Sequence, residues 1–310
     1  MRKLRYFLEY LPILLFDCFF QLWSRSAAFK MGEGIGILFS FAMPSRKRLV
    51  IKNLTESFPE KSPQEIQQIA KKFWKHLGRV AVEFIRLSDI NEKNWEQYYL
   101  WEGKEIVDRL KPLGRGVILV SFHFSNWEYL GAGVQFAWPD NLAIARPMKN
   151  PYVERWVQAK RSSGERKIIH HKNAVRAGLR TLKDNKSLGV FVDQNLYTGG
   201  VFVNFFGRPA ASTTLPALLR SRTEAPIVMI YIVREGTKFK IILEPPLELP
   251  PIEEGTDWLR QHTQIITDQI ERIIRTQPET WFWIHNRWKR KPGSPGDGSQ
   301  TPELAETLET

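Results

Sequence analysis

The run from Gly116 to Glu128, Gly-Val-Ile-Leu-Val-Ser-Phe-His-Phe-Ser-Asn-Trp-Glu, constrains the fold more than any other stretch of the chain. Val117 to Phe122 is a short, mostly apolar run that is typical of a buried strand. Polar residues follow it, and a long apolar segment comes next, so the pattern predicts a strand, a turn and the start of a helix. In an open α/β sheet, ligands bind outside the carboxyl ends of the strands. His123 is therefore expected at such an end.

The rest of the chain predicts an α/β fold around this strand. Apolar runs typical of strands occur at 142–145, 167–170, 188–192 and 225–233, and helical patterns at 62–85, 150–163, 173–184 and 257–276. The alternating run 238–243 predicts an antiparallel edge hairpin with the strand that ends at Val233. Strands that alternate with helices predict a mostly parallel mixed sheet that is flanked by helices on both faces.

His123 and Glu128 are the candidate catalytic residues. On one straight helix they would lie about 140° apart, but they can meet if His123 is on the turn and Glu128 is in the first helical turn. A carboxylate on one imidazole nitrogen fixes the tautomer and leaves the other nitrogen free as a base, which can take a proton from an alcohol that attacks an acyl carbonyl. The alternative is structural, because Ser125-Asn-Trp-Glu128 also fits a capping box and His123 could simply end a strand.

Composition limits the class of protein and of partner. The 310 residues, 43% of them hydrophobic, suffice for one large globular domain. The single Cys18 excludes a disulfide framework and a multi-cysteine zinc site. A net charge of +12 indicates an anionic partner, which is nucleic acid, anionic lipid or an acidic protein. We expect no nucleic acid, because the sequence has no zinc-finger spacing, no phosphate-binding loop and no ribonucleoprotein motif.

The N-terminal region predicts contact with a membrane. Residues 4–23 are largely apolar on one broad helical face, but Arg5, Glu9 and Asp17 lie on the other side. A charge at the centre of a membrane-spanning helix costs about 2.5–3.5 kcal/mol, so these three argue against a span. The pattern favours a helix that lies in the membrane interface, with a core helix as the alternative.

A second apolar segment, 34–44, ends in the basic run Ser45-Arg-Lys-Arg48. Basic clusters favour the anionic cytoplasmic leaflet by about 1 kcal/mol for each charge. We therefore divide the chain into a membrane-associating segment over 1–45, an α/β domain over 46–290 and a disordered tail over 291–310, which is rich in Gly, Pro and acidic residues.

The motif His123-Phe-Ser-Asn-Trp-Glu128 resembles the His-x4-Asp/Glu signature of the glycerolipid-type acyltransferases. It is most similar to the branch that carries Glu in this position, the late acyltransferases of lipid A biosynthesis. The likeness extends from about Arg46 to Lys291. It includes Arg146-Pro147 after a strand, Arg161 shortly before Gly164, Asp193-Gln194 at a strand end, the stretch from Gly199 to Thr213, and the Trp-rich segment 278–289.

The resemblance implies an O-acyltransferase with the glycerolipid acyltransferase architecture. It would move a fatty acyl group from a thioester donor, acyl carrier protein or acyl-CoA, to a hydroxyl of a lipid A precursor or related glycolipid. It would act at the cytoplasmic face of the bacterial inner membrane, on an anionic surface. No cofactor or metal is expected, because the thioester is already activated and the sequence offers no metal-binding cluster.

The resemblance also assigns substrate-binding candidates. Arg146 and Arg161 are candidates for binding phosphate on the acceptor or for polarising the thioester carbonyl, since the guanidinium fork suits such groups. Asp193, Asn126 and Arg208 are further candidates for substrate contact. Two alternative functions stay open: an acyltransferase for a lysophospholipid or another glycolipid, and a non-catalytic protein that binds lipid or nucleic acid.

Overall fold

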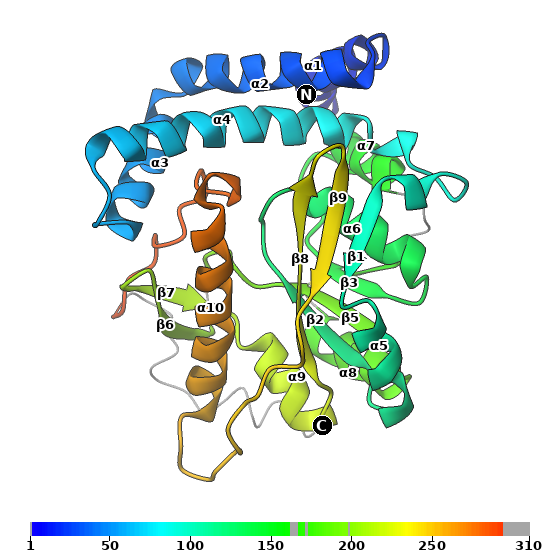
Figure 1. The fold of residues 1–310 in the computed structure, drawn as a ribbon, viewed down its shortest axis with the longest axis vertical. Coiled ribbons are helices and arrows are strands. Elements are labelled where there is room, and N and C mark those ends of the chain that lie inside the picture. The colour runs from blue at the N-terminus through cyan, green and yellow to red at the C-terminus, as the bar shows by residue number, and fades with distance from the viewer. Residues whose placement is uncertain (1, 162–166, 171–172, 198, 294–310) are drawn as a thin grey trace.

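The computed structural model describes residues 2–161, 167–170, 173–197 and 199–293. A seven-stranded sheet forms its centre, in the order β1-β9-β8-β2-β5-β3-β4 (Figure 1). The strands are β1 (Tyr99–Glu102), β2 (Val117–Ser121), β3 (Leu142–Ala145), β4 (Lys167–His170), β5 (Ser187–Phe191), β8 (Ile227–Glu235) and β9 (Lys238–Leu243). The strands from β8 to β4 are mutually parallel, whereas β9 is antiparallel to β8. The predicted mostly parallel mixed sheet is confirmed.

Helices cover both faces of the sheet, as predicted. On one face lie α5 (Glu105–Leu110) and α6 (Trp127–Ala137), and on the other lie α8 (Ala174–Lys183), α9 (Leu215–Thr223) and α10 (Trp258–Thr276). Strand β2 shows the reason, because successive side chains of a strand point to opposite faces. Val117 and Leu119 pack with α6, whereas Ile118 and Val120 pack with the α8–α10 layer. A strand whose five residues are all buried therefore requires cover on both sides.

The prediction of an edge hairpin at β8 and β9 is half right. The two strands pair antiparallel from Ile230 opposite Leu243 to Glu235 opposite Lys238. Strand β9 is not an edge, however, because β1 pairs with it in parallel on its other side. The two strands lie far apart in the sequence and are not joined by a turn, so no local sequence pattern predicts their pairing.

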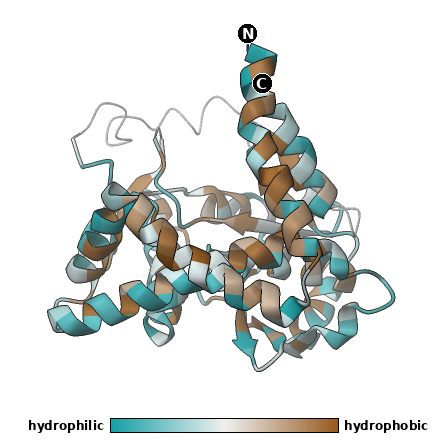
Figure 2. Ribbon diagram, turned by 90° about the horizontal axis from the view of Figure 1, so that it is seen from above, coloured by the Kyte–Doolittle hydropathy of each residue, from teal (hydrophilic) through white to brown (hydrophobic). Residues whose placement is uncertain are grey.

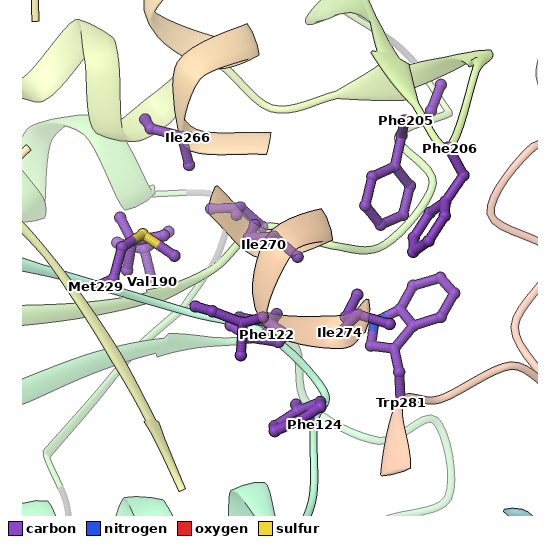
Figure 3. Packing of buried hydrophobic residues seen from close by; sticks show 14 of the residues in the cluster. Phe122, Phe124, Val190, Phe205, Phe206, Met229, Ile266, Ile270, Ile274 and Trp281 are labelled. Atoms are coloured by element: carbon purple, nitrogen blue, oxygen red, sulfur yellow. The ribbon is translucent and has the colours of Figure 1, made fainter. Parts of the chain in front are cut away.

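The stretch after β5 forms a separate two-stranded hairpin of β6 (Val201–Phe205) and β7 (Arg208–Ser212). Its two-residue turn, Phe206-Gly207, has positive φ at both positions, 53° and 72°, as a type I′ turn requires. Phe205 and Phe206 extend from this turn toward Trp281 and the apolar face of α10, where Figure 3 shows them closing one side of the core.

A long helix, α4 (Pro63–Ile85), lies across one end of the sheet (Figure 1). It begins at the predicted position. A capping box starts it, in which the backbone N–H of Ser62 donates to the Glu65 carboxylate at 2.8 Å. Helix α2 (Arg25–Ala42) packs on it without intervening side chains. A Cβ added to Gly36 would lie 2.0 Å from the Trp74 carbonyl oxygen, so the backbones touch at this crossing. Helix α3 (Pro44–Ser57) then leads from α2 to α4.

Helix α1 (Arg2–Gln21) projects from the body of the molecule (Figure 2). Only Phe20 is buried, whereas Leu4, Leu8 and Leu15 are about 60% exposed. The polar side docks on α7 (Pro151–Arg161), where Asp17 accepts hydrogen bonds from Trp156 Nε1 and Lys160 Nζ. The core-helix alternative is therefore wrong. Each helix in the described part of the chain is too short or too polar to span a bilayer.

Candidate active site

The carboxyl ends of β2 and β5 define the site. The two strands are parallel neighbours in register, with Ser121 opposite Phe191. The chain leaves β2 toward α6 on one face and leaves β5 toward the hairpin and α9 on the other. Such a divergence opens a crevice where ligands bind in α/β sheets. His123 and Asp193 each lie two residues beyond the paired strand ends, so the sheet brings them together.

Asp193 holds one side of the His123 imidazole. Asp193 Oδ1 lies 2.8 Å from Nδ1 of His123, and Oδ2 accepts from the His123 backbone N–H at 2.9 Å and from Trp281 Nε1 at 2.8 Å. Burial of the carboxylate opposes its ionisation. The nearby His123 ring and these donated hydrogen bonds outweigh burial and hold the pKa of Asp193 below its ordinary value. An ionised Asp193 can only accept, so Nδ1 carries the proton.

The other ring nitrogen of His123, Nε2, carries the lone pair. Nε2 lies 3.3 Å from the Gln194 side-chain nitrogen, which can donate to the lone pair there. Trp127, Phe191 and Phe282 surround the ring with centroid separations of 5.1 to 5.9 Å. The imidazole is thus fixed by one carboxylate and three aromatic rings, with about 19% of its side chain exposed.

Glu128 occupies a different place from the one predicted. Its carboxylate forms a bidentate ion pair with Arg161, at 2.9 Å to Nε and 2.5 Å to Nη2. We expected Glu128 to contact the His123 imidazole. The carboxylate on His123 Nδ1 is instead that of Asp193. The reason is geometric: Glu128 lies in the first turn of α6, facing α7, whereas Asp193 lies on the adjoining strand end.

The capping-box alternative for Glu128 is also wrong. The N-cap of α6 is Asn126, whose Oδ1 accepts from the Tyr129 backbone N–H at 3.0 Å. Asn126 Nδ2 donates to Glu83 at 2.7 Å, and the whole residue is buried. Burial and these two bonds favour a structural role for Asn126 over the predicted contact with substrate. Ser125 precedes the cap with a φ of 51°, which turns the chain from the strand end into the helix.

Helix α4 holds this turn from behind. Glu83 is completely buried and accepts from Asn126, from Arg79 Nε at 3.0 Å and from Arg234. His76 lies on the same face of α4, seven residues before Glu83. Its Nε2 lies 3.0 Å from the Ser125 carbonyl oxygen. Burial lowers the pKa of His76 to about 4, so it is a neutral donor. Sequence reasoning missed both residues. Their spacing of seven, which places them on one helix face, was the available signal.

The remaining predicted residues are dispersed. Arg146 is exposed just beyond β3. Arg208 lies at the start of β7, where it pairs with Glu56 and donates to Ser57 Oγ at 2.7 Å. The structure thus brings His123, Asp193, Glu128 and Arg161 to one end of the sheet and sets Arg208 against α3. Within the described residues, no group of three or more His, Cys, Asp or Glu side chains is placed to hold a metal ion.

A histidine held at Nδ1 by an ionised acid, with its lone pair on Nε2, has the chemistry that a general base for a hydroxyl requires, and it lies at the strand ends of an α/β sheet. The family model for the bacterial lipid A biosynthesis acyltransferases matches residues 1–290, and the chain belongs to that family. It is an acyltransferase that uses an acyl donor and a lipid acceptor. Enzymes of this family are membrane-associated.

Individual relatives are distant. The chain is 26% identical to the lipid A biosynthesis palmitoleoyltransferase of Escherichia coli K12 over 266 residues, which are 84% of this chain and 85% of the relative. It is 25% identical to the lauroyltransferase of the same organism over 293 residues, 93% of each chain. It is also 24% identical to the phosphatidylinositol mannoside acyltransferase of Mycolicibacterium smegmatis over 180 residues, 56% and 57% of the two chains. The first two names give lipid A and the third gives phosphatidylinositol mannoside, so the family establishes acyl transfer and leaves the acceptor open.

Proposed function

We propose that this enzyme transfers a fatty acyl group from acyl carrier protein to a hydroxyl of a lipid A precursor or a closely related glycolipid. The observation that carries the proposal is the His123–Asp193 pair, which leaves Nε2 as a base at the switch point of the sheet. The two lipid A acyltransferases of Escherichia coli cover more of the chain than the mannoside acyltransferase does, which favours the lipid A precursor.

In the proposed reaction, Nε2 of His123 takes the proton of the acceptor hydroxyl as its oxygen attacks the thioester carbonyl. Asp193 stabilises the resulting imidazolium. The tetrahedral intermediate collapses with cleavage of the C–S bond, and the imidazolium returns its proton to the departing thiolate. Backbone N–H groups in the first turn of α6 can stabilise the oxyanion, because the N-terminal amides of a helix lack intrahelical partners.

Arg146 and Arg161 stay our candidates for the phosphate or carbonyl of the substrates, and Glu128 orients Arg161. The exposed guanidinium of Arg146 is available for an acceptor phosphate. The pair with Glu128 uses the N–H groups on Nε and Nη2 of Arg161, so the remaining N–H groups of the guanidinium can contact a substrate. A basic protein of net charge +12 also suits an acidic carrier protein as donor.

Substitution of His123 tests the chemistry. A general base contributes about 10²- to 10⁴-fold, so His123→Ala and His123→Gln should both lower kcat by that order. Turnover is measured with acyl carrier protein that carries a defined acyl chain and with a lipid A precursor, and the melting temperature checks the fold. Wild-type turnover in a folded His123→Gln protein would show that His123 is not the general base.

The acceptor requires a separate experiment. Mass spectrometry of lipids from a strain that lacks the protein should show a lipid A species short of one acyl chain. An unchanged lipid A together with an under-acylated glycolipid of another class would instead support an acceptor like that of the mannoside acyltransferases.

We also propose that α1 holds the enzyme at the cytoplasmic face of the inner membrane. The exposed leucines of α1 support this, because an amphipathic helix binds in proportion to the apolar area it buries in lipid. Replacing Leu4, Leu8 and Leu15 with Gln should shift the protein from the membrane to the soluble fraction. Replacing Lys71, Lys72 and Lys75, which are exposed on α4, provides a control with the same number of changes.

A further inference from the structure

A polar pocket of about 220 Å³ lies apart from His123, between α3 and the segment that ends the described chain. None of the residues that contact the His123 ring lines it. The lining residues are Leu49, Lys52, Asn53, Glu56, Arg208, Asn286, Trp288, Lys289 and Lys291. Four cationic side chains thus face one carboxylate, which gives the pocket a strong excess of positive charge.

Arg208 is fixed at the wall of this pocket. Its guanidinium lies over the Trp288 ring at 3.4 Å from the centroid and is held by Glu56 and Ser57. The one carboxylate of the lining is therefore already engaged by Arg208, and it also lies 3.9 Å from Lys52. Within the described part of the chain, the buried Nε of Arg208 has no hydrogen-bond partner. A guanidinium held in place in this way is a preorganised cation and is suited to an anion.

The size and lining of the pocket limit its ligand. Sites for drug-sized molecules measure about 300–1,000 Å³ and are mostly apolar. This pocket is smaller than that, and only Leu49 and Trp288 in its lining are apolar. It therefore suits a small anionic group and excludes an acyl chain. A phosphate ester, with several acceptor oxygens around one centre, matches a set of Lys, Arg and Asn donors.

The neighbourhood of the pocket indicates where that phosphate comes from. Leu49, Lys52 and Glu56 recur at helical spacing on α3, and Ser45 and Arg48 continue the same stripe back to the start of the helix. From Pro44 to Lys52 the distance along the axis is about 12 Å. Directly before Pro44, the last turns of α2 and its C-cap Met43 expose apolar side chains, which are Leu38, Phe39, Phe41 and Met43. An apolar tip beside a basic pocket is the arrangement of a protein that enters a lipid surface and contacts its headgroups.

We propose that this pocket binds the phosphate of an anionic phospholipid headgroup while the tip of α2 inserts among the acyl chains. The site is a membrane contact that is distinct from the acyl-transfer site and does not rest on the proposed acceptor. It adds a second attachment point to the exposed face of α1. The bilayer would then contact the α3 end of the molecule as well as α1.

The test is binding of the full-length protein to phosphatidylglycerol vesicles, measured by co-sedimentation. Lys52 and Lys289 are exposed, so Lys52→Gln with Lys289→Gln should leave the fold intact. At about 1 kcal/mol for each basic residue near an anionic surface, their loss should weaken binding about 30-fold. The matched control is Lys111→Gln with Lys183→Gln, which removes the same charge beside the amino ends of β2 and β5. We expect its binding to stay within about twofold of wild type.

Two further experiments distinguish binding in the pocket from binding to a charged surface. Asn286→Trp fills the pocket without changing charge and should weaken vesicle binding as strongly as the lysine pair does. Dihexanoyl phosphatidylglycerol should compete with the vesicles at concentrations where inorganic phosphate does not. Equal losses in the pocket and control variants, unchanged binding of Asn286→Trp, or competition by inorganic phosphate alone would each overturn the proposal. So would unchanged vesicle binding with a raised KM for acyl carrier protein.

Discussion

Two pairs of hydrogen-bonded side chains, His123–Asp193 and Glu128–Arg161, lie at the same end of the sheet and differ in how the fold produces them. His123 and Asp193 come from the ends of adjacent parallel strands, and the side chain of Asp193 is only 2% exposed. Glu128 and Arg161 come from two helices, α6 and α7, and are 11% and 22% exposed. Strand register fixes the first pair. The second pair joins two helices, and its side chains are more exposed to solvent.

This difference teaches that proximity in sequence is a poor guide to partnership at strand ends. Glu128 is five residues from His123 and Asp193 is seventy, yet Asp193 has the hydrogen bond to Nδ1. We expect the strand-end pair to set the protonation state of the base. We expect the helix pair to hold a cation that meets the substrates.

Asp193→Asn should have the largest effect. An amide at this position can donate to Nδ1 and so favour the tautomer with its proton on Nε2, which cannot act as a base. We expect kcat to fall about 10²- to 10⁴-fold, in the range of a lost general base. The double variant with His123→Ala should be no slower than His123→Ala alone, because the two residues act as a unit. If the two losses add in full, His123 and Asp193 act independently, which would contradict the proposed pair.

Glu128→Gln should have a smaller effect. The substitution keeps an acceptor for Arg161 but removes the charge, and a hydrogen bond to a charged group contributes about 1.5–3 kcal/mol. We expect activity to fall about 10- to 100-fold, with a change in acceptor KM as part of the loss. Steady-state kinetics with each substrate varied in turn measures this. A loss as large as that of Asp193→Asn, with KM unchanged, would place Glu128 at the imidazole during turnover.

The two predicted arginines should differ. Arg146 is exposed, and Arg146→Ala should raise the acceptor KM several-fold with little change in melting temperature. Arg161→Ala leaves the Glu128 carboxylate without its bidentate partner and should lower both kcat and stability, because breaking a partly buried pair costs more than losing an exposed charge. Identical kinetic losses in the two variants would show that they contribute only general positive charge.

Two histidines near the strand-end pair should make the stability of the folded protein sensitive to acid. His76 bonds to the Ser125 carbonyl, and Nε2 of His285 accepts from the backbone N–H of Asn195. Burial lowers the pKa of each to about 4. Between about pH 6.5 and pH 4 the unfolded chain binds protons that the folded chain does not, so stability falls as pH falls through this window.

At pH 5 each histidine should cost at most about 2 kcal/mol of unfolding free energy relative to neutral pH. Urea unfolding at pH 7.5 and pH 5, compared between wild type and His285→Gln, measures the contribution of His285. The variant should show a shallower pH dependence. An identical pH dependence in both would remove His285 from this effect.

Local sequence patterns determined the location of the site and most strands and helices of the central sheet, but they did not predict β1 or the hairpin of β6 and β7. The apolar run before His123 predicts β2, and Ser62, Pro63 and Glu65 mark the start of α4, because caps and strands depend on neighbouring residues. The parallel sheet with helices on both faces follows from the alternation of these elements. The polar residues after β2 predict a site there, since strand ends in such sheets face ligands.

Tertiary structure alone decided the partners. Whether Asp193 or Glu128 meets His123 depends on β5 lying beside β2, and strand order across a sheet leaves no mark within either strand. The burial of Glu83 and its bond to Asn126 likewise require α4 to cross behind the turn. The pairing of β1 with β9 and the basic pocket beside α3 have the same origin. Each joins segments more than a hundred residues apart, and such contacts are set by the packing of whole elements rather than by local sequence.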